Sequence, residues 1–193
     1  PYESSGNFMQ KKVLNYFCRK FLSLAYVNTF PSKKLQQYIL KRTGNTKELK
    51  SLIIPHIGFR KVNKVKKKKK ICRMCHAGNL SKERDPTNFI LALDNLTKKG
   101  LIEVQVDFVG CIEQCFYDFL KGQNFLEINI IEPMSYDKSL KEMEKYDILV
   151  VIEADMQESI FLPSKVADYA SLNIPILAIS SLLRVTFDFS VNC

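Results

Sequence analysis

Ile148-Leu149-Val150-Val151-Ile152 is apolar at every position. A strand with one face in water alternates apolar and polar residues, whereas a strand covered on both faces is a continuous apolar run. Most of these residues are β-branched, which favours an extended chain. We therefore expect residues 148–152 to form a central strand of a parallel sheet that helices cover on both sides.

Similar apolar runs recur on either side of this stretch, separated by segments in which apolar residues follow the helical period. Strands are predicted over residues 71–77, 104–110, 126–131, 148–152 and 175–179. Helices are predicted between them, over residues 86–100, 112–122, 136–146 and 163–169. This alternation predicts an α/β domain over residues 71–193 with a Rossmann-like, doubly wound parallel sheet.

The first 70 residues differ from this domain in charge and in pattern. The net charge is +9; residues 1–70 carry eighteen basic and two acidic side chains, and the rest of the chain carries eleven and eighteen. Helices are predicted over residues 13–24 and 32–40, the second capped by Ser32, and short strands over residues 26–30 and 51–57. Residues 58–70 are predicted to be a basic linker, because a segment so rich in lysine cannot bury a core.

The composition excludes several classes of protein. Of 193 residues, 46% are hydrophobic and 25% are charged, which is typical of a globular protein and not of a disordered or fibrous one. No apolar run approaches the ~20 residues of a membrane-spanning helix, and no export signal precedes the six cysteines. We expect a cytoplasmic protein with reduced thiols. Because the sequence starts at Pro1 and stops soon after an apolar segment, we also expect an excerpt of a longer protein.

Cys72-Arg73-Met74-Cys75-His76 has the spacing of a c-type haem attachment site. That chemistry requires an exposed loop in an oxidising compartment, whereas this segment falls in a predicted buried strand. A zinc site would combine Cys72 and Cys75 with Cys111 and Cys115, but strand residues three positions apart lie on opposite faces. We favour packing of these thiols in the core. No metal and no other cofactor is predicted.

Seven lysines crowd the predicted linker, namely Lys61, Lys64, Lys66, Lys67, Lys68, Lys69 and Lys70. Such a run is either a solvated hinge or a surface that attracts polyanions. No aromatic side chains interleave the run, as nucleic-acid binding by base stacking would require. An anionic membrane surface is therefore a better candidate partner than nucleic acid, and it would place the protein peripherally on the inner membrane surface.

Polar and basic residues follow the first predicted strand of the domain. Gly78 and Asn79 begin the loop, and Arg84 lies shortly before Pro86 at the predicted helix start. Open α/β sheets bind ligands at the carboxyl ends of their strands. There Gly78 permits a close backbone approach, while Arg84 and helix amides are placed to hold a phosphate. Loops with Gly and Arg are common, so this pattern alone is a weak indication.

The loop after the predicted central strand is acidic at first and then basic. It carries Glu153, Asp155 and Glu158 before Pro163-Ser164-Lys165, and Asp168 follows one helical turn later. Ser164 and Lys165 are predicted to hold phosphate oxygens, and Asp168 to accept hydrogen bonds from ribose hydroxyls. The alternative is an ordinary exposed pair of charges on a surface helix. Two such loops at one sheet edge predict a nucleotide-binding crevice.

Three blocks of the sequence resemble the carboxyl-terminal domain of GT-B glycosyltransferases, and among these the glycosyltransferase group 1 (family 4) enzymes. The blocks are Ala77-Gly78-Asn79-Leu80 with Arg84, Asp147-Ile148-Leu149-Val150-Val151, and residues 161–178, which contain Pro163-Ser164-Lys165. The resemblance covers about residues 48–180, and Ile54-Pro55-His56 is similar to the end of the family's amino-terminal domain. It implies that residues 1–57 are the tail of an acceptor domain and that residues 71–193 are a donor domain truncated at its end.

Carried over residue by residue, the resemblance implies donor binding by Gly78, Asn79, Arg84, Glu158, Ser164, Lys165 and Asp168. The sequence departs from the family pattern at two positions. Asn79 stands where the family has a diphosphate-binding arginine, and Ile160 stands where it has the first of two glutamates. Asp168 keeps the second, ribose-facing acid. Ser164 and Lys165 match a variant of the family in which a Pro-Ser-Lys motif takes over phosphate contacts.

The resemblance implies a retaining transfer of a glycosyl group from a nucleotide-diphosphate sugar to a glycan or lipid-linked acceptor, without a metal ion. It places the catalytic residues, which the sequence does not identify, in the amino-terminal domain, so the excerpt alone is expected to be inactive. A second class stays open, namely a non-catalytic nucleotide- or anion-binding module associated with RNA or with an anionic membrane surface. A preference for a nucleoside diphosphate would favour the first class, and steep salt dependence the second.

Overall fold

The computed structural model describes residues 8–44, 49–58, 71–154 and 163–180. The chain forms two compact units. The first contains the described residues 8–44 and 49–56, and the second contains residues 57–58, 71–154 and 163–180. The lysine run of residues 61–70, Glu158 and Ile160 lie outside the described residues, so what was predicted for them stays a prediction.

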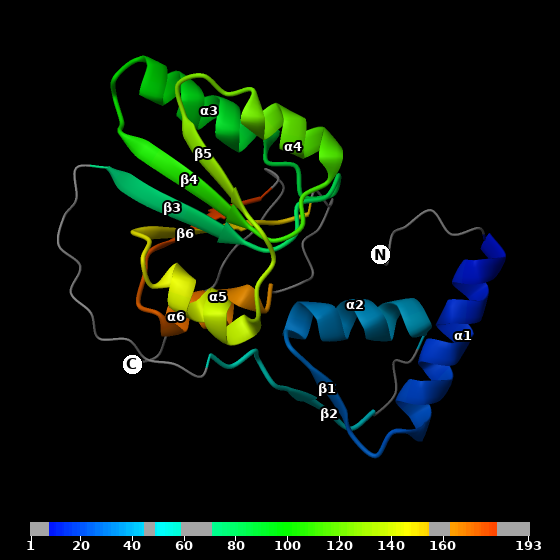
Figure 1. Cartoon of the computed structure of the whole chain (residues 1–193). Coiled ribbons are helices and arrows are strands. Elements are labelled where there is room, and N and C mark those ends of the chain that lie inside the picture. The colour runs from blue at the N-terminus through cyan, green and yellow to red at the C-terminus, as the bar shows by residue number, and fades with distance from the viewer. Residues whose placement is uncertain (1–7, 45–48, 59–70, 155–162, 181–193) are drawn as a thin grey trace. The chain divides into compact units, whose positions relative to one another are not determined.

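In the first unit, a helix connects two short parallel strands (Figure 1). The strands are β1 (Asn28–Phe30) and β2 (Ser51–Ile53), and the helix is α2 (Lys33–Thr43). The predicted cap of α2 is confirmed, because the Ser32 hydroxyl accepts a hydrogen bond from the Leu35 amide at 3.1 Å. Both strands are shorter than predicted.

The first helix of this unit, α1 (Phe8–Leu24), starts earlier than predicted and turns its apolar face outward. Its polar face packs on α2, where Arg19 donates to the Thr43 carbonyl at 2.5 Å and Arg42 donates to Asn15 Oδ1 at 3.1 Å. No residue of α1 is buried. The exposed apolar side chains are Phe8, Met9, Val13, Leu14, Tyr16, Phe17, Phe21 and Leu24. Nothing in the described part of the first unit covers this surface.

The second unit is a Rossmann-like α/β domain with a five-stranded, all-parallel sheet. Its strands are β3 (Cys72–Ala77), β4 (Val104–Val109), β5 (Glu127–Ile131), β6 (Ile148–Ile152) and β7 (Ile176–Ile179). They lie in the order β5-β4-β3-β6-β7. Over the described residues, the predicted doubly wound parallel sheet is confirmed, with each strand within a few residues of its expected position.

Two helices lie on each face of this sheet (Figure 1). α3 (Thr87–Lys98) and α4 (Gln114–Lys121) cover one face, and α5 (Tyr136–Met143) and α6 (Lys165–Ser171) cover the other. The chain runs outward from β3 to β5 and then returns to β6, and right-handed crossovers therefore put the two pairs of helices on opposite faces. The carboxyl ends of β3 and β6 border the switch point, where open α/β sheets bind ligands.

Two apolar clusters hold the helices to the sheet, and β6 contributes to both. Val150 and Ile152 belong to the cluster with the buried residues of α3 and α4, and Leu149 and Val151 belong to the cluster with those of α5 and α6. None of these four side chains is more than 2% exposed. Each such burial stabilises the fold by about 2 kcal/mol. The prediction that residues 148–152 form a strand covered on both faces is confirmed.

The two cysteines of β3 lie on opposite faces of the sheet, as predicted. Cys72 packs against the cluster under α3 and α4, whereas Cys75 is buried in the cluster under α5 and α6. These two thiols therefore cannot share one metal ion, and Cys75 is closed to haem attachment. Burial raises the pKa of both thiols, which keeps them protonated and unreactive.

The prediction that Cys111 and Cys115 pack in the core is wrong, because both are exposed. α4 begins at Gln114, and its buried residues are Phe116 and Leu120. Cys115 precedes Phe116 by about 100° around the helix and therefore faces away from the sheet. Cys111 lies before the helix and does not share its buried face.

Candidate functional site

The ladder between β3 and β6 is short. Two residue pairs form it, Met74 with Ile148 and Cys75 with Leu149. On the other side of β3, the ladder with β4 continues through the last residue of the strand, Ala77. β3 and β6 therefore separate toward their carboxyl ends, at the switch point of the sheet.

Two side chains pair with backbone groups where β3 and β6 separate. His76 Nδ1 donates to the Val150 carbonyl at 3.0 Å, and the Ala77 amide donates to the Tyr169 hydroxyl at 3.0 Å. Both side chains are buried. The sheet opens here without leaving these backbone groups unpaired, which a buried amide or carbonyl requires.

Gly78 directly follows β3, with a φ of 154° that favours glycine. Its amide donates to the Val109 carbonyl at 2.8 Å. A Cβ at this position would lie 2.2 Å from Lys165 Nζ and 3.4 Å from His76 Nε2. The close approach predicted for Gly78 is thus made here by the protein's own lysine.

Lys165 starts α6, and its side chain reaches across the end of β3. Its Nζ donates to the Ala77 carbonyl at 3.0 Å. Burial, and after it the charge of Arg84, lowers the pKa of Lys165 to about 8. Among the described residues, no carboxylate lies within ion-pair distance of Lys165 or Arg84. Two cations therefore share this edge of the sheet with no counter-ion from the described ranges, which favours the binding of an anion.

Arg84 lies in the loop between β3 and α3 and is exposed. The loop is turned by a bond from the Arg84 amide to the Ser81 carbonyl at 2.8 Å. Just before α3, Asp85 Oδ1 accepts from the Thr87 amide at 2.8 Å, although the cap residue of the helix, Pro86, supplies no capping side chain. A carboxylate therefore occupies the Thr87 amide, and the predicted use of the other amides at the start of α3 for a phosphate stays a prediction. The guanidinium of Arg84 remains placed for an anion.

His76 is a site residue that the sequence analysis did not identify. It is fully buried, and because the Val150 carbonyl can only accept, its Nδ1 carries the proton. Burial, followed by the charge of Lys165, lowers the pKa of His76 to about 3, so the ring is neutral. Its Nε2 is an acceptor with no hydrogen-bond partner among the described residues. The signal in the sequence was a polar residue near the carboxyl end of a strand, two positions before Gly78.

Three other predicted site residues lie near this edge with contacts of their own. Asn79 Oδ1 accepts from the Cys111 amide at 3.2 Å, which ties the loop after β3 to the loop after β4. Ser164 is exposed, and its hydroxyl makes no capping bond to α6. Asp168 Oδ1 accepts from the Tyr136 hydroxyl at 2.6 Å and does not pair with Lys165. Their roles in donor binding stay predictions.

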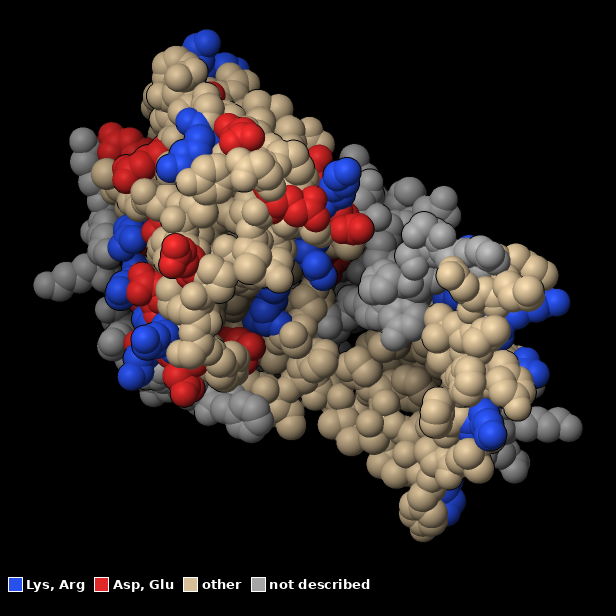
Figure 2. All heavy atoms as spheres, turned by 45° about the vertical axis from the view of Figure 1, so that its right-hand side comes forward, with Lys and Arg blue, Asp and Glu red and all other residues tan. Residues whose placement is uncertain are grey.

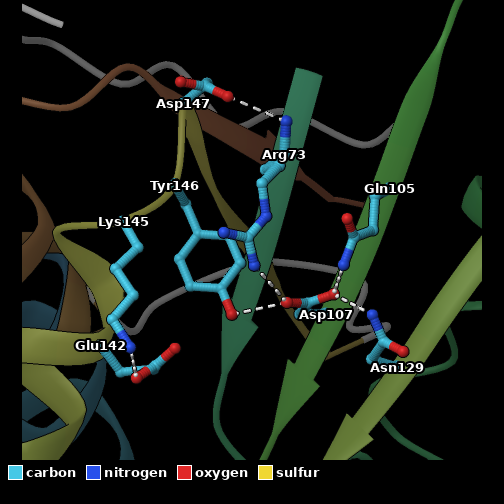
Figure 3. A network of polar contacts seen from close by, with 8 residues as sticks. All are labelled: Arg73, Gln105, Asp107, Asn129, Glu142, Lys145, Tyr146 and Asp147. Atoms are coloured by element: carbon cyan, nitrogen blue, oxygen red, sulfur yellow. Dashed lines mark hydrogen bonds and ion pairs between the residues drawn. The ribbon is translucent and has the colours of Figure 1, made fainter. Parts of the chain in front are cut away.

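A second polar cluster, which we call the Asp107 network, lies on the face of the sheet that carries α5 (Figure 3). Asp107 is 2% exposed. Its Oδ2 accepts from the Tyr146 hydroxyl at 2.6 Å and from Arg73 at 3.2 Å, and its Oδ1 accepts from Gln105 and from Asn129 at 2.9 Å each. Four donors satisfy the carboxylate, so this network indicates a structural role.

Two further observations bear on cofactors and relatives. In the described ranges, no group of three or more His, Cys, Asp or Glu side chains is close enough to hold a metal ion. No protein-family model matches the chain, and no curated protein matches it significantly. The geometry of the switch point and the sequence resemblance are therefore the observations that bear on function.

Proposed function

We propose that this protein binds a nucleoside diphosphate at the carboxyl ends of β3 and β6, with the phosphates held by Lys165 and Arg84. The observation that carries the proposal is the pair of cations at the switch point, one of them half-buried, without a carboxylate partner among the described residues. Burying a cation without a counter-ion is unfavourable. A diphosphate would supply the missing charge through charge-assisted hydrogen bonds.

On the sequence resemblance, we propose further that the ligand is a nucleotide-diphosphate sugar and that the whole protein is a retaining glycosyltransferase of the GT-B type. The second unit would be its donor domain, and residues 1–57 would belong to the domain that binds a glycan or lipid-linked acceptor. As the sugar departs, negative charge grows on the diphosphate leaving group. Lys165 and Arg84 would stabilise that charge at the switch point, without a metal ion.

A thermal-shift titration with UDP, GDP, CDP, ADP and the matching nucleotide sugars tests the binding site. A ligand at 100 times its Kd stabilises the native state by about 2.7 kcal/mol, so one nucleotide series should raise Tm. Lys165→Met is expected to abolish the shift. Lys145→Met is the matched control, because Lys145 lies just after α5, pairs with Glu142 at 2.6 Å and is largely exposed. Equal shifts for Lys165→Met and the unchanged chain would contradict the proposal.

The first unit supports a second candidate function, contact with an anionic membrane surface. Its described residues carry nine Lys and Arg and no Asp or Glu, and in Figure 2 basic side chains appear on it without acidic ones. α1 adds an exposed apolar face that includes Phe17 and Phe21. A basic amphipathic helix of this kind lies in the headgroup region of an anionic bilayer. No described helix is both long and apolar enough to cross the bilayer.

Flotation with vesicles separates this second candidate from the first. We expect the chain to float with phosphatidylglycerol-containing vesicles and not with pure phosphatidylcholine, and salt should weaken the binding. The double substitution Phe17→Ser and Phe21→Ser should reduce flotation several-fold. Leu91→Ser on α3 is the control, since Leu91 is also an exposed apolar residue on a helix. Equal flotation of the double variant and the control would exclude α1 as the contact. Replacing Lys66 to Lys70 with glutamine tests the linker separately.

A further inference from the structure

His76 Nε2, an acceptor with no partner among the residues that the structure describes, restricts which ligand group can approach the switch point. His76 Nε2 and Lys165 Nζ both lie close to one point beside Gly78, at 3.4 Å and 2.2 Å from the place of its missing Cβ. They reach it from opposite faces of the sheet, because His76 contacts the Phe108 ring of one cluster and α6 packs in the other. A ligand phosphate that engages Lys165 would therefore place its neighbouring group next to Nε2.

The protonation of His76 determines the chemistry of that neighbouring group. The Val150 carbonyl holds the only proton of the neutral ring on Nδ1. Nε2 thus presents a lone pair, which repels a phosphate oxygen and accepts from a hydroxyl or an N–H group. The pKa of His76, lowered to about 3 mainly by burial, keeps Nε2 unprotonated at neutral pH.

We propose that His76 Nε2 accepts a hydrogen bond from a sugar hydroxyl of the ligand, beside the phosphate held by Lys165 and Arg84. The inference deepens the proposed function and rests on it, because the cations bind the phosphate and His76 accepts a hydrogen bond from the adjacent sugar. Two sugars carry such hydroxyls, the ribose of the nucleotide and the transferred sugar.

The position of Lys165 implies that the phosphate contact forms before the sugar contact of His76. In the structure, its Nζ donates to the Ala77 carbonyl and lies where a Gly78 side chain would be. A phosphate draws Nζ away from that carbonyl, since a charge-assisted bond is stronger than one to a neutral acceptor. The space beside Nε2 then opens for the hydroxyl, so phosphate binding precedes sugar recognition.

His76→Asn tests the proposal on the whole chain. The asparagine side-chain amide can replace Nδ1 as donor to the Val150 carbonyl, whereas no atom of asparagine replaces Nε2. His56→Asn is the control, because His56 is the other histidine and is exposed. Affinities are measured by calorimetry for pyrophosphate, UDP, UDP-glucose, GDP and GDP-mannose. In parallel, the imidazole ¹⁵N resonances are recorded with each ligand, and His56 serves as the internal reference.

We expect His76→Asn to leave the affinity for pyrophosphate within about twofold and to lower the affinity for the hydroxyl-bearing ligand about three- to tenfold, the effect of one lost hydrogen bond. The Nε2 resonance of His76 should move with that ligand and not with pyrophosphate. A change that begins with UDP or GDP identifies the ribose, and one that appears only with the nucleotide sugars identifies the transferred sugar.

Two results would overturn this inference alone, with the proposed function intact. One is an equal loss of affinity for pyrophosphate and for the nucleotides, which would mean a structural role for His76. The other is nucleotide binding with no effect of His76→Asn and no movement of Nε2. If no nucleotide binds the chain, and Lys165→Met changes nothing, then the proposed function fails and this inference fails with it.

Discussion

The Asp107 network and the switch point are two polar sites of one domain, and they differ in whether their polar groups have hydrogen-bonding partners. Asp107 is buried and accepts from four donors, and Tyr146 and Arg73 are held by it in turn. At the switch point, His76 Nε2 is also buried but has no partner among the described residues. Lys165 and Arg84 there have no carboxylate within ion-pair distance in the part of the chain that the structure describes.

This difference separates a polar group that stabilises the fold from one to which the proposed function assigns a ligand. A buried carboxylate with all its donors in place specifies how β3, β4 and β5 align with the turn between α5 and β6. A buried acceptor without a donor costs about 1–3 kcal/mol, and folding alone gains nothing from it. Substitutions should therefore change mainly stability in the Asp107 network and mainly binding at the switch point.

Removing Asp107 should have the largest effect. Asp107→Ala leaves Arg73 and Tyr146 without their acceptor in a buried setting, and we expect a loss of about 3 kcal/mol in the free energy of unfolding. Urea unfolding with an unchanged m-value measures it. Asn129→Ala, which removes only one of the four donors, should cost about 1 kcal/mol. Equal losses in the two variants would mean that Asp107 does not organise the network.

The two glycines at the ends of β3 and β4 should respond differently to alanine. Gly110 has a φ of 143°, and its Cβ would lie 2.6 Å from the Gly78 carbonyl oxygen, which is backbone and cannot move aside. We expect Gly110→Ala to cost about 2 kcal/mol. Gly78→Ala meets the mobile end of Lys165 instead, so it should cost less stability and weaken nucleotide binding more. Thermal unfolding with and without nucleotide compares them, and the opposite ranking would contradict this geometry.

Acid should destabilise the protein through His76. The pKa of His76 is lowered from its usual value near 6.5 to about 3, mainly by burial. Between these values the unfolded chain binds a proton that the folded chain does not, so the stability present above pH 6.5 falls as the pH drops. The contribution is about 1 kcal/mol between pH 7 and pH 5.5. Unfolding of the unchanged chain and of His76→Asn at both pH values measures it, and equal pH dependence would refute the burial of a neutral imidazole.

Lys165→Met should change stability least and in the opposite direction. Burial lowers the pKa of Lys165 to about 8, so the charged form is disfavoured by folding. Replacing it with methionine is expected to raise stability at pH 7 by about 1 kcal/mol while nucleotide binding is lost. The unchanged chain should gain stability from about pH 8 to pH 10.5 relative to this variant, because its unfolded state holds the proton longer. A large destabilisation would instead give Lys165 a structural role.

Much of the domain was predictable because its signals are local. The apolar runs, Pro86 before α3, Gly122 after α4 and Ser32 before α2 all act within a few residues, and the structure has these elements at their expected positions. Gly78 and Lys165 were also identified, since ligand loops in such sheets follow the strands. Boundaries were less accurate for α1, β1 and β2, where no comparably strong stop signal occurs.

The errors came from contacts between distant segments. The packing of Cys111 and Cys115 depends on where α4 starts and how it is rotated, and periodicity alone gave the wrong face. Asp107 stands among apolar strand residues, and its four donors come from four segments. His76 is recognisable as a candidate site residue only from two tertiary contacts. Its Nδ1 bonds to the Val150 carbonyl, and Lys165 lies close to Gly78 beside its Nε2.

By itself, the sequence determined the type and order of the elements, the parallel sheet and the two loops at its carboxyl edge. It did so because burial on both faces of β6 and the capping of the helices depend on residues that are adjacent in the sequence. Only the tertiary structure decided which polar groups are satisfied and which are left open. The bonds from Arg73 and Asn129 to Asp107 and from His76 to Val150 join residues 22 to 74 positions apart, and no local pattern encodes them.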